Sequence, residues 1–222
     1  IRPRLLVTGS ARLDLVRRGG DSLAGRYLLH RLYPFSAAEL KDTMPPHESI
    51  PALMALGGFP EPFLSGSKKT ADRWRINYLD RIIREDVRDL TGLRDSTSVR
   101  ILIDMLRERV GSPVSYRSLA EDLAVSPVTV KSWIDVLEAM FIVFRVAPYH
   151  TNIARALKKE SKIYFYDIGM VRGDAGVRFE NLVALSLLKH LHFRADTIGE
   201  ENALCYVRDK EKREVDFAVV KD

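Results

Sequence analysis

Two places in the sequence put polar side chains beside or inside an apolar run, where such side chains can bind a ligand or take part in a reaction. Leu5-Leu6-Val7 is a short apolar run that ends on Thr8-Gly9-Ser10. Such a run is typical of an inner parallel strand, which brings a polar side chain to the carboxyl edge of an α/β sheet, where ligands bind. Much later in the sequence, Asp216 lies inside the apolar run 215–219. Alternation leaves both faces of that strand largely apolar, so this carboxylate needs an ion pair, a hydrogen bond or a metal ion.

Further segments carry a family resemblance. Ala24-Gly25-Arg26 precedes an apolar segment that ends on Pro34-Phe35-Ser36, and Gly57-Gly58-Phe59-Pro60 follows. Thr8-Gly9-Ser10 and residues 24–36 resemble the second half of a P-loop ATPase domain of the AAA+ type, in a prokaryotic family of ATPases that carries a C-terminal domain of unknown function, and Gly57-Gly58-Phe59-Pro60 resembles a hallmark of the same family. The resemblance implies that Thr8-Gly9-Ser10 marks the sensor-1 strand and that residues 24–36 close the ATPase domain. By turn chemistry alone, the Gly-Gly-Phe-Pro segment predicts a sharp backbone turn.

The resemblance assigns nucleotide chemistry to two residues. It implies that Ser10 contacts the γ-phosphate or the attacking water, and that Arg26 is an arginine finger or sensor that stabilises phosphoryl charge. An ion pair of Arg26 with Asp14 or Asp21 is the alternative. The sequence contains no G-x-x-x-x-G-K-[ST] loop, and no strand with a terminal acidic pair precedes Leu5. We therefore expect ATP and Mg²⁺ to be cofactors of an intact protein of which this chain is a fragment. We expect the fragment itself to bind no cofactor and to hydrolyse no ATP.

The middle of the sequence has a clear helical pattern. Amphipathic spacing predicts helices over residues 98–110, 118–123 and 126–140, followed by an apolar strand over residues 141–146. A tight turn separates the last two helices, and Ser126 fits the N-cap of the third. Helix, helix, short turn, helix and strand is the order of a winged helix.

A winged helix contacts DNA through two parts. One is the set of outward side chains at the start of the helix that follows the tight turn, and the other is the wing. The outward residues here are Ser126, Thr129, Lys131 and Ser132, and the basic residues of the wing loop are Arg155, Lys158 and Lys159. A basic wing can lie along phosphates or in a minor groove. A solvated loop, or a helical pair that packs against protein, is the alternative. Double-stranded DNA, a protein partner and a second copy of the chain all remain open as partners.

The C-terminal segment combines a predicted helix, 178–192, with strands over 204–208 and 214–220 joined by a polar hairpin turn. With Glu180 early in the helix and Asp216 on the second strand, it resembles the front of the restriction-endonuclease-like core. In that core a helix Glu, a strand Asp and a Glu-x-Lys hold Mg²⁺ and activate water. The resemblance implies that Glu180 and Asp216 are the first two groups, with Asp216 as the metal ligand.

The third group of that core, the Glu-x-Lys, is absent from the sequence. Lys189 and Lys221 are the nearby lysines, and neither has the motif spacing. We therefore expect no DNA cleavage by this chain. The alternative is that Asp216 pairs with a Lys or Arg and that Glu180 lies on a helix surface.

An earlier segment, residues 70–90, has the spacing of one long helix. Its expected buried stripe is Ile76, Leu79, Ile83, Val87 and Leu90.

Composition is that of an ordinary globular protein, with 46% apolar and 29% charged residues. The net charge of +5 permits an anionic partner without requiring one. Cys205 is the single cysteine, which excludes an internal disulfide and suits the cytoplasm. No apolar run reaches the length of a bilayer span, and no signal-peptide pattern is present, so we expect a cytoplasmic protein without a membrane partner.

These patterns predict a mixed α/β and α+β fold in three parts. Residues 1–43 are the expected end of a P-loop AAA+ ATPase sheet, and residues 44–170 a helical and winged-helix domain that begins in the proline-rich loop. Residues 171–222 are the expected partial restriction-endonuclease-like α/β unit. The first functional hypothesis is a fragment of an ATP-binding ATPase whose winged helix binds DNA. The second is a non-enzymatic winged-helix regulatory module that binds DNA or protein.

Overall fold

The structure, a computed structural model, describes residues 30–87, 97–150, 160–209 and 213–221, together with Leu6, Thr8, Leu28 and Glu211. Leu6 and Thr8 belong to neither helix nor strand, and Leu6 is 90% exposed. The strand expected at residues 5–7 is therefore not formed at Leu6, because no described strand runs beside it to satisfy its backbone hydrogen bonds. Ser10 and Arg26 lie outside the described residues.

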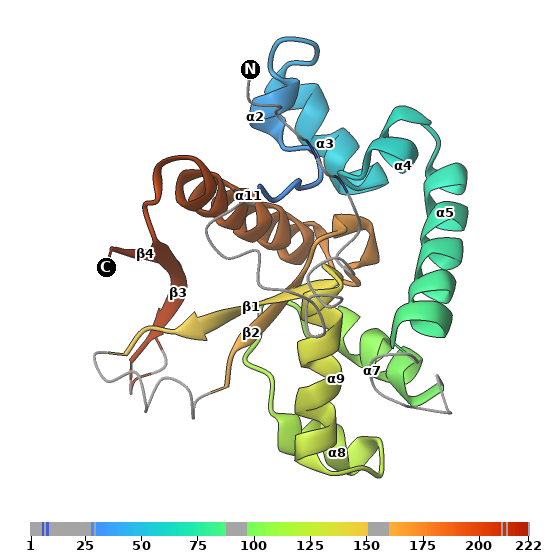
Figure 1. Ribbon diagram of the computed structural model, residues 1–222, viewed down its shortest axis with the longest axis vertical. Helices are drawn as coiled ribbons and strands as arrows, with labels where there is room; N and C mark the ends of the chain where they lie inside the picture. Colours follow the sequence, from blue (N-terminus) through green and yellow to red (C-terminus); the bar gives the residue numbers. More distant parts are fainter. Residues whose placement is uncertain are drawn as a thin grey trace.

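The described part of the chain has a mixed α/β architecture in which helices come first and most strands come late (Figure 1). The elements are α2 (Ala37–Leu40), α3 (Pro46–Leu56), α4 (Pro60–Leu64), α5 (Lys68–Arg81), the π-helix η2 (Ile82–Val87), α7 (Thr97–Arg107), α8 (Tyr116–Asp122), α9 (Pro127–Ala139), β1 (Val143–Pro148), β2 (Lys162–Phe165), the 3₁₀ turn η3 (Ile168–Met170), α11 (Ala175–Ile198), β3 (Asn202–Arg208) and β4 (Glu214–Lys221).

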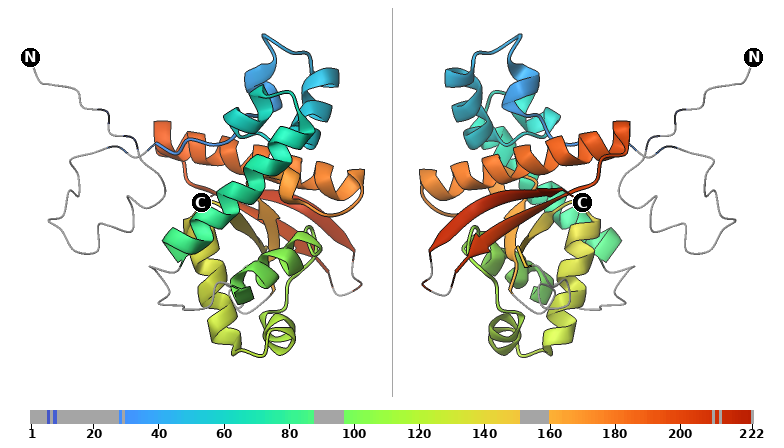
Figure 2. Two further views of the ribbon diagram at one scale, coloured as in Figure 1. Left: turned by 90° about the vertical axis from the view of Figure 1, so that its right-hand side faces the viewer. Right: turned by 90° about the vertical axis from the view of Figure 1, so that its left-hand side faces the viewer.

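The four strands form one mixed sheet in the order β2-β1-β3-β4. β1 pairs antiparallel with β2 and parallel with β3, and β3 pairs antiparallel with β4. The long helix α11 lies on one side of the sheet, whereas α8 and α9 lie on the other (Figure 2). The parallel pairing of β1 with β3 is short, at Ala147 with Cys205 and Pro148 with Tyr206. This pairing joins the strands that follow the helices to the hairpin that follows α11.

The core is continuous across both expected domain boundaries. The sheet spans the expected boundary at residue 170, because β1 and β2 precede that residue while β3 and β4 follow it. At the expected boundary between residues 43 and 44, Phe35 and Leu40 on one side pack with Leu53 and Phe63 on the other. Residues on either side of each boundary therefore share packed interiors.

The helical region agrees closely with the spacing that predicted it. The predicted apolar face over residues 98–110 is buried, at Val99, Leu102, Leu106 and Val110. Ser126 is the N-cap of α9, where its hydroxyl accepts the Thr129 N–H at 3.0 Å.

Two boundaries in this region differ from those predicted. α8 begins at Tyr116 rather than at residue 118, because the Ser115 hydroxyl caps it by accepting the Ser118 N–H. β1 begins at Val143 rather than Phe141, because Phe141 has φ 54° in the turn that ends α9.

The expectation that Ile76 is buried is wrong, and Phe179 of the predicted 178–192 helix is exposed as well. Ile76 is 63% exposed, because α5 presents Ala71 and Arg75 to the interior instead. The regular helix also gives way to the π-helix η2 at Ile82, which changes the angular position of the residues that follow. Phe179 is 47% exposed, since the buried face of α11 runs through its neighbours Asn181 and Leu182. None of the helices in the described ranges has the length and apolar composition needed to cross a bilayer.

Candidate functional site

A cluster of charged side chains gathers where β2, β4 and α11 meet. Lys162 opens β2, and its side chain is 1% exposed. Its ammonium lies 2.5 Å from Glu214 Oε1, 2.8 Å from Asp216 Oδ1 and 3.6 Å from Glu180 Oε1. We call these four residues the Lys162 cluster. One buried cation thus faces three carboxylates that come from two other elements.

Local structure explains how each member reaches this place. Asn181 fixes the start of α11 against β2, because its amide accepts the Phe165 N–H and donates to the Phe165 carbonyl, both at 2.8 Å. Glu180 is the residue before Asn181, so its carboxylate is held over β2, where the Tyr164 hydroxyl donates to it at 2.7 Å. Glu214 and Asp216 are two apart on β4, so they project from the same face of that strand.

β4 reaches β2 although two strands separate them in the sheet order. The aromatic rings of Tyr164 and Phe217 are 5.8 Å apart. β1 meets β3 only near the end of β1, and the register of β3 with β4 shifts between Cys205 and Val207, so the four strands do not form a regular flat sheet. The Tyr206 ring of β3 completes the enclosure, with its centroid 5.4 Å from the Lys162 ammonium.

The surroundings hold Lys162 in its charged form. Burial alone lowers the pKa of Lys162, but its hydrogen bonds with Asp216 and Glu214 outweigh burial and raise the pKa above its ordinary value. Burial, followed by the hydrogen bond to Glu180, raises the pKa of the Tyr164 hydroxyl. The Lys162 ammonium and the neutral Tyr164 phenol beside the cluster therefore both donate to its carboxylates.

The sequence-predicted pair Glu180 and Asp216 is brought together, yet its surroundings differ from those of a magnesium site. Mg²⁺ requires oxygens about 2.0–2.1 Å away in octahedral geometry. Here the Lys162 ammonium lies among the oxygens that would ligate the ion. No group of three or more His, Cys, Asp or Glu in the described ranges is arranged to hold a metal ion. The residues present therefore do not fit Mg²⁺, and Asp216 is paired with a lysine, as the alternative interpretation of the sequence expected.

Lys162, Glu214 and Tyr164 were not anticipated from the sequence. The available signal was a lysine at the start of a strand whose four residues are all buried. Such a lysine requires a partner, but its partners lie 18 or more positions away in the sequence. Asp216 is also less buried than its apolar run suggested, with 53% of its side chain exposed.

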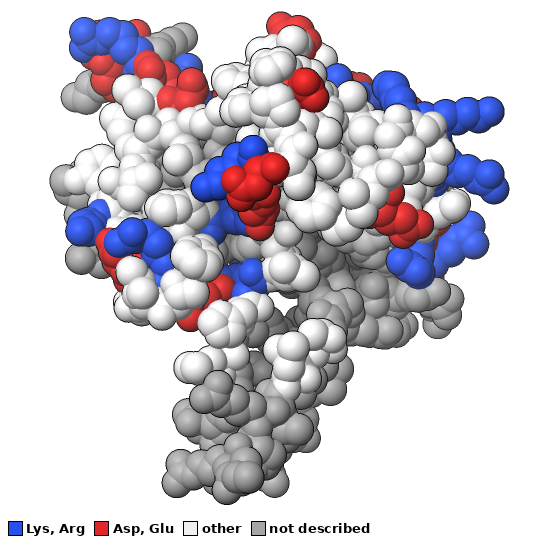
Figure 3. All heavy atoms as spheres, turned by 90° about the horizontal axis from the view of Figure 1, so that it is seen from above, with Lys and Arg blue, Asp and Glu red and all other residues white. Residues whose placement is uncertain are grey.

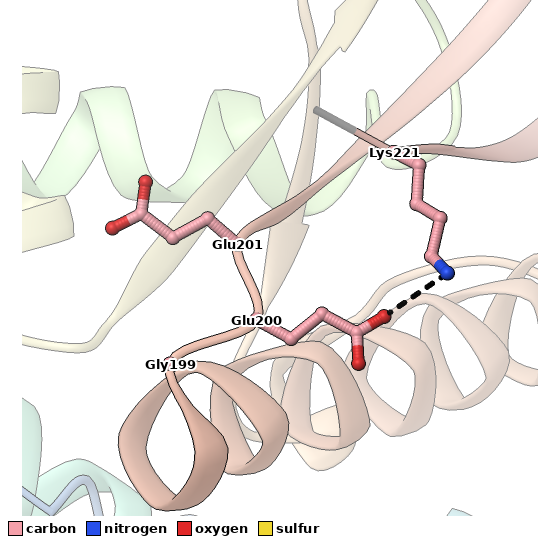
Figure 4. Close-up of a pocket in the computed structure, with 4 residues that line it drawn as sticks. All are labelled: Gly199, Glu200, Glu201 and Lys221. Atoms are coloured by element: carbon pink, nitrogen blue, oxygen red, sulfur yellow. Dashed lines mark ion pairs between the residues drawn. The ribbon is translucent and has the colours of Figure 1, made fainter.

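The two lysines considered from the sequence lie elsewhere. Lys189 donates to the Pro34 carbonyl at 2.8 Å and also contacts Glu39. Lys221 is 3.6 Å from Glu200, beside an open hollow at the C-terminal end of α11 (Figure 4). Glu200 points toward Lys221 there, whereas Glu201 points away.

The exposed face at the start of α9 is the predicted DNA-contacting surface. Ser126, Lys131 and Ser132 are exposed, and Thr129 is half-buried, with its hydroxyl 2.8 Å from that of Ser126. Lys131 donates to Asp135 at 2.8 Å. The other predicted contacts, Arg155, Lys158 and Lys159, lie outside the described residues.

Carboxylates neutralise the cations on and beside this face. Arg145 of β1 contacts Asp135 and lies 2.9 Å from Glu138. Burial alone raises the pKa of Asp135, but its hydrogen bonds with Lys131 and Arg145 outweigh burial and lower the pKa below its usual range. The described outer face of α9 therefore offers hydroxyls and paired charges rather than free cations.

Comparison with known proteins gives the family. Residues 47–179, more than half of the 222 residues, match the family described as Domain of unknown function (DUF8612). The chain belongs to this family. An uncharacterized protein of Mycobacterium tuberculosis and one of Mycobacterium bovis are each 28% identical to it over 174 residues. These matches cover 78% of this chain and 38% of each relative.

A more distant relative supports the same pattern of partial coverage. An uncharacterized protein of Haemophilus influenzae is 25% identical over 204 residues, covering 83% of this chain and 51% of that protein. The chain thus spans from 38% to about half of the length of the curated relatives it matches. No solved structure matches it.

The DUF8612 match contains a buried ion pair that the sequence pattern did not indicate. Arg75 Nε lies 2.6 Å from Asp167 Oδ2, and the two side chains are 6% and 1% exposed. Arg75 also bonds Asp72 and the Leu56 carbonyl. Asp167 accepts the Gly169 N–H at 2.9 Å, so it caps the following turn. Burial raises the pKa of Asp167, while Arg75 acts in the opposite direction.

This pair explains two glycines of the family region. Gly57 has φ 79°, and a Cβ there would overlap the Asp167 carboxylate. A Cβ on Gly169 would overlap the Arg75 guanidinium. The sharp turn predicted for Gly57-Gly58-Phe59-Pro60 is present, and Gly58 accepts the Phe35 N–H at 2.7 Å. The ion pair ties α5 to α3 and η3.

Proposed function

We propose that this chain is the C-terminal part of an AAA+-type P-loop ATPase, and that its described region is a non-enzymatic winged-helix module acting through protein contacts. Helix, tight turn, helix and β-hairpin follow one another in α8, α9, β1 and β2, which is the order of a winged helix. The observation that carries the protein-contact proposal is the charge-neutralised outer face of α9.

Binding to a phosphate backbone is driven largely by cations that displace condensed counterions. Lys131 and Arg145 are held by Asp135 and Glu138, so neither is free for that role without breaking its ion pairs. The same surface carries Val128, which is 77% exposed at the start of α9. A small apolar side chain surrounded by hydroxyls and paired charges is suited to a protein interface with a polar rim.

The surface at the opposite end of the molecule supports the same interpretation. Acidic and basic side chains are interspersed over much of the described part of the face seen from above, and basic side chains gather along its right-hand edge (Figure 3). That face includes α2, whose Glu39 pairs with Lys189 of α11. Mixed charges of this kind do not create the single-signed field that attracts a polyanion.

The ATPase part of the proposal rests on the sequence resemblance of residues 1–43 and on chain length. More than half of the Mycobacterium tuberculosis relative lies outside the match, which leaves room for a nucleotide-binding half. We propose no step of hydrolysis within the described residues. Ser10 and Arg26 would act only when the phosphate-binding loop is present.

The ATPase proposal is tested on the complete protein encoded by the gene that contains this sequence. Phosphate release from ATP is measured for that protein and for its Ser10→Ala and Arg26→Ala variants. Loss of a charge-stabilising group at a phosphoryl-transfer site is expected to lower the rate by about 10²–10³-fold. Arg84→Ala is the control, because Arg84 is an exposed arginine whose side chain is 73% exposed. Wild-type rates in both test variants would refute the assignment.

Duplex DNA binding is the second candidate function. It is favoured by the helix–turn–helix and hairpin order and by the basic wing loop with Arg155, Lys158 and Lys159. Fluorescence anisotropy with a duplex at 50 and 200 mM salt separates the two candidates. Protein-contact function predicts no saturable binding at micromolar protein, whereas DNA binding predicts an affinity that falls steeply with salt.

If binding is seen, alanine at all three wing cations should abolish it. The matched control removes three exposed cations elsewhere, namely Lys41, Lys69 and Arg81. Equal losses in the two triple variants would indicate a general charge effect rather than a wing interface.

A further inference from the structure

The Lys162 cluster has the composition of a cation site whose cation is part of the chain. Three carboxylates, from Glu180, Glu214 and Asp216, converge on one ammonium at 2.5–3.6 Å. Glu214 has a further cation, Arg208, at 3.6 Å, and Glu180 accepts from Tyr164. Removal of the ammonium would leave three like charges crowded together at the junction of two strands and a helix.

Like charges that converge on one place repel each other, and partial burial strengthens the repulsion. Glu180 and Glu214 have side chains only 25% and 24% exposed, so water screens them incompletely. A cation placed among the three carboxylates offsets their mutual repulsion. The Lys162 side chain, at 1% exposure, supplies that cation from within the protein.

We infer that Lys162 is the resident cation of this cluster: its ammonium offsets the charge of the three carboxylates, excludes a divalent ion, and clamps β4 and α11 to β2. The cluster is thus a structural joint in a nuclease-like arrangement rather than a magnesium-dependent active site. This inference is independent of the ATPase and winged-helix proposals, because it concerns only residues 162–216.

The first test is divalent-ion binding by the wild-type chain. Mn²⁺ is titrated up to 10 mM and followed by its electron paramagnetic resonance signal and by Tm. The inference predicts no saturable binding and a change in Tm within about 1 °C, the size expected for a stability change of a few tenths of a kcal/mol. Binding or a larger rise in Tm that disappears in Asp216→Asn would overturn the inference, since the carboxylates would then hold the ion despite Lys162.

The second test removes the ammonium. Lys162→Ala should lower Tm by about 5–10 °C, because it leaves uncompensated, partly buried charge. It should also gain Mn²⁺ or Ca²⁺ binding in the millimolar range. With a Kd of about 1 mM, 10 mM ion then raises Tm by about 3–5 °C. Asp216→Asn in the same background should remove this gain.

Lys189→Ala is the matched control. Lys189 also lies on a described helix, pairs with a carboxylate and has a side chain only 19% exposed. Its loss should lower Tm without creating ion-dependent recovery, because a single carboxylate, Glu39, faces it. Recovery by Mn²⁺ in Lys189→Ala, or its absence in Lys162→Ala, would overturn the inference. If Lys162→Ala folds only when Mn²⁺ is present during refolding, the inference is supported, and failure to fold with the ion would refute it.

Discussion

His192 makes the stability of the protein depend on pH in a direction that can be calculated. It lies on α11 beside Tyr33, whose hydroxyl bonds to its Nδ1, and the two rings are 5.7 Å apart. Arg31 and Asp196 form an ion pair next to it. Burial, followed by the positive charge of Arg31, lowers the pKa of His192 to about 4, with Asp196 acting in the opposite direction. Tyr166, the other titratable group at this contact, packs against Tyr33.

The sign follows from proton linkage. The folded-state pKa of about 4 lies below the unfolded value of 6.5, so the unfolded chain binds the additional proton between these values. The contribution of His192 is therefore fully present above about pH 6.5 and is lost as pH falls toward 4. At about 1.36 kcal/mol for each factor of ten, the loss reaches about 2 kcal/mol at pH 5 and about 3 kcal/mol below pH 4. A loss of about 2 kcal/mol lowers Tm by roughly 4–8 °C.

The assay compares wild type with His192→Asn, whose amide keeps a hydrogen-bond acceptor near Nδ1 but does not titrate. Urea unfolding at pH 8, 6 and 5 gives the free energy of unfolding of each protein. Other titrating groups affect both proteins alike, so the difference between them should shift by about 2 kcal/mol from pH 8 to pH 5 in favour of the variant. His190→Asn, at an exposed position of the same helix, should show no such shift. A difference that stays constant within about 0.5 kcal/mol over this range would refute the argument.

Three further predictions concern stability. Asp167→Asn and Arg75→Met should each lower the free energy of unfolding by about 3–5 kcal/mol, because each leaves a buried charge without its partner. The double variant should lose less than the sum, and additive losses in urea titrations would contradict a direct pair. Gly169→Ala should cost about 1–3 kcal/mol or more, since its Cβ would overlap the Arg75 guanidinium; a wild-type Tm would show that the contact relaxes freely. Ser126→Ala should cost about 1 kcal/mol through loss of the α9 cap, with Ser132→Ala as the exposed control, and equal effects would argue against the cap.

The sequence predicted best those elements whose physical cause is local. The buried face of α7 follows from apolar residues at three- and four-residue spacing, and the start of α9 follows from a serine cap with proline after it. The hairpin of β3 and β4 likewise follows from its polar turn. Helical period, caps and turns are set within a few residues, so a single sequence contains the information.

The remainder depends on contacts between distant residues. Arg75 belongs by its type to a solvated helix face, and only Asp167, 92 positions later, makes its burial tolerable. The burial of Lys162 could not be predicted for the same reason, because its partner Asp216 lies 54 positions later in the sequence. Glu180 and Asp216 were identified as a pair through resemblance, but the lysine between them was not. Charged residues in an interior are fixed by their partners, and a linear pattern does not record those partners.

The parallel junction of β1 with β3 has a practical consequence for dissecting this protein. A shortened chain that stops after residue 170 would lose the strand to which the Tyr149 N–H donates. It would also uncover Tyr164, which Phe217 and Glu180 now shield. Bare strand edges beside exposed aromatic rings promote self-association. The segment that contains α8, α9, β1 and β2 should therefore be expressed together with α11 and the β3–β4 hairpin. Attempts to produce either part alone are expected to yield aggregates.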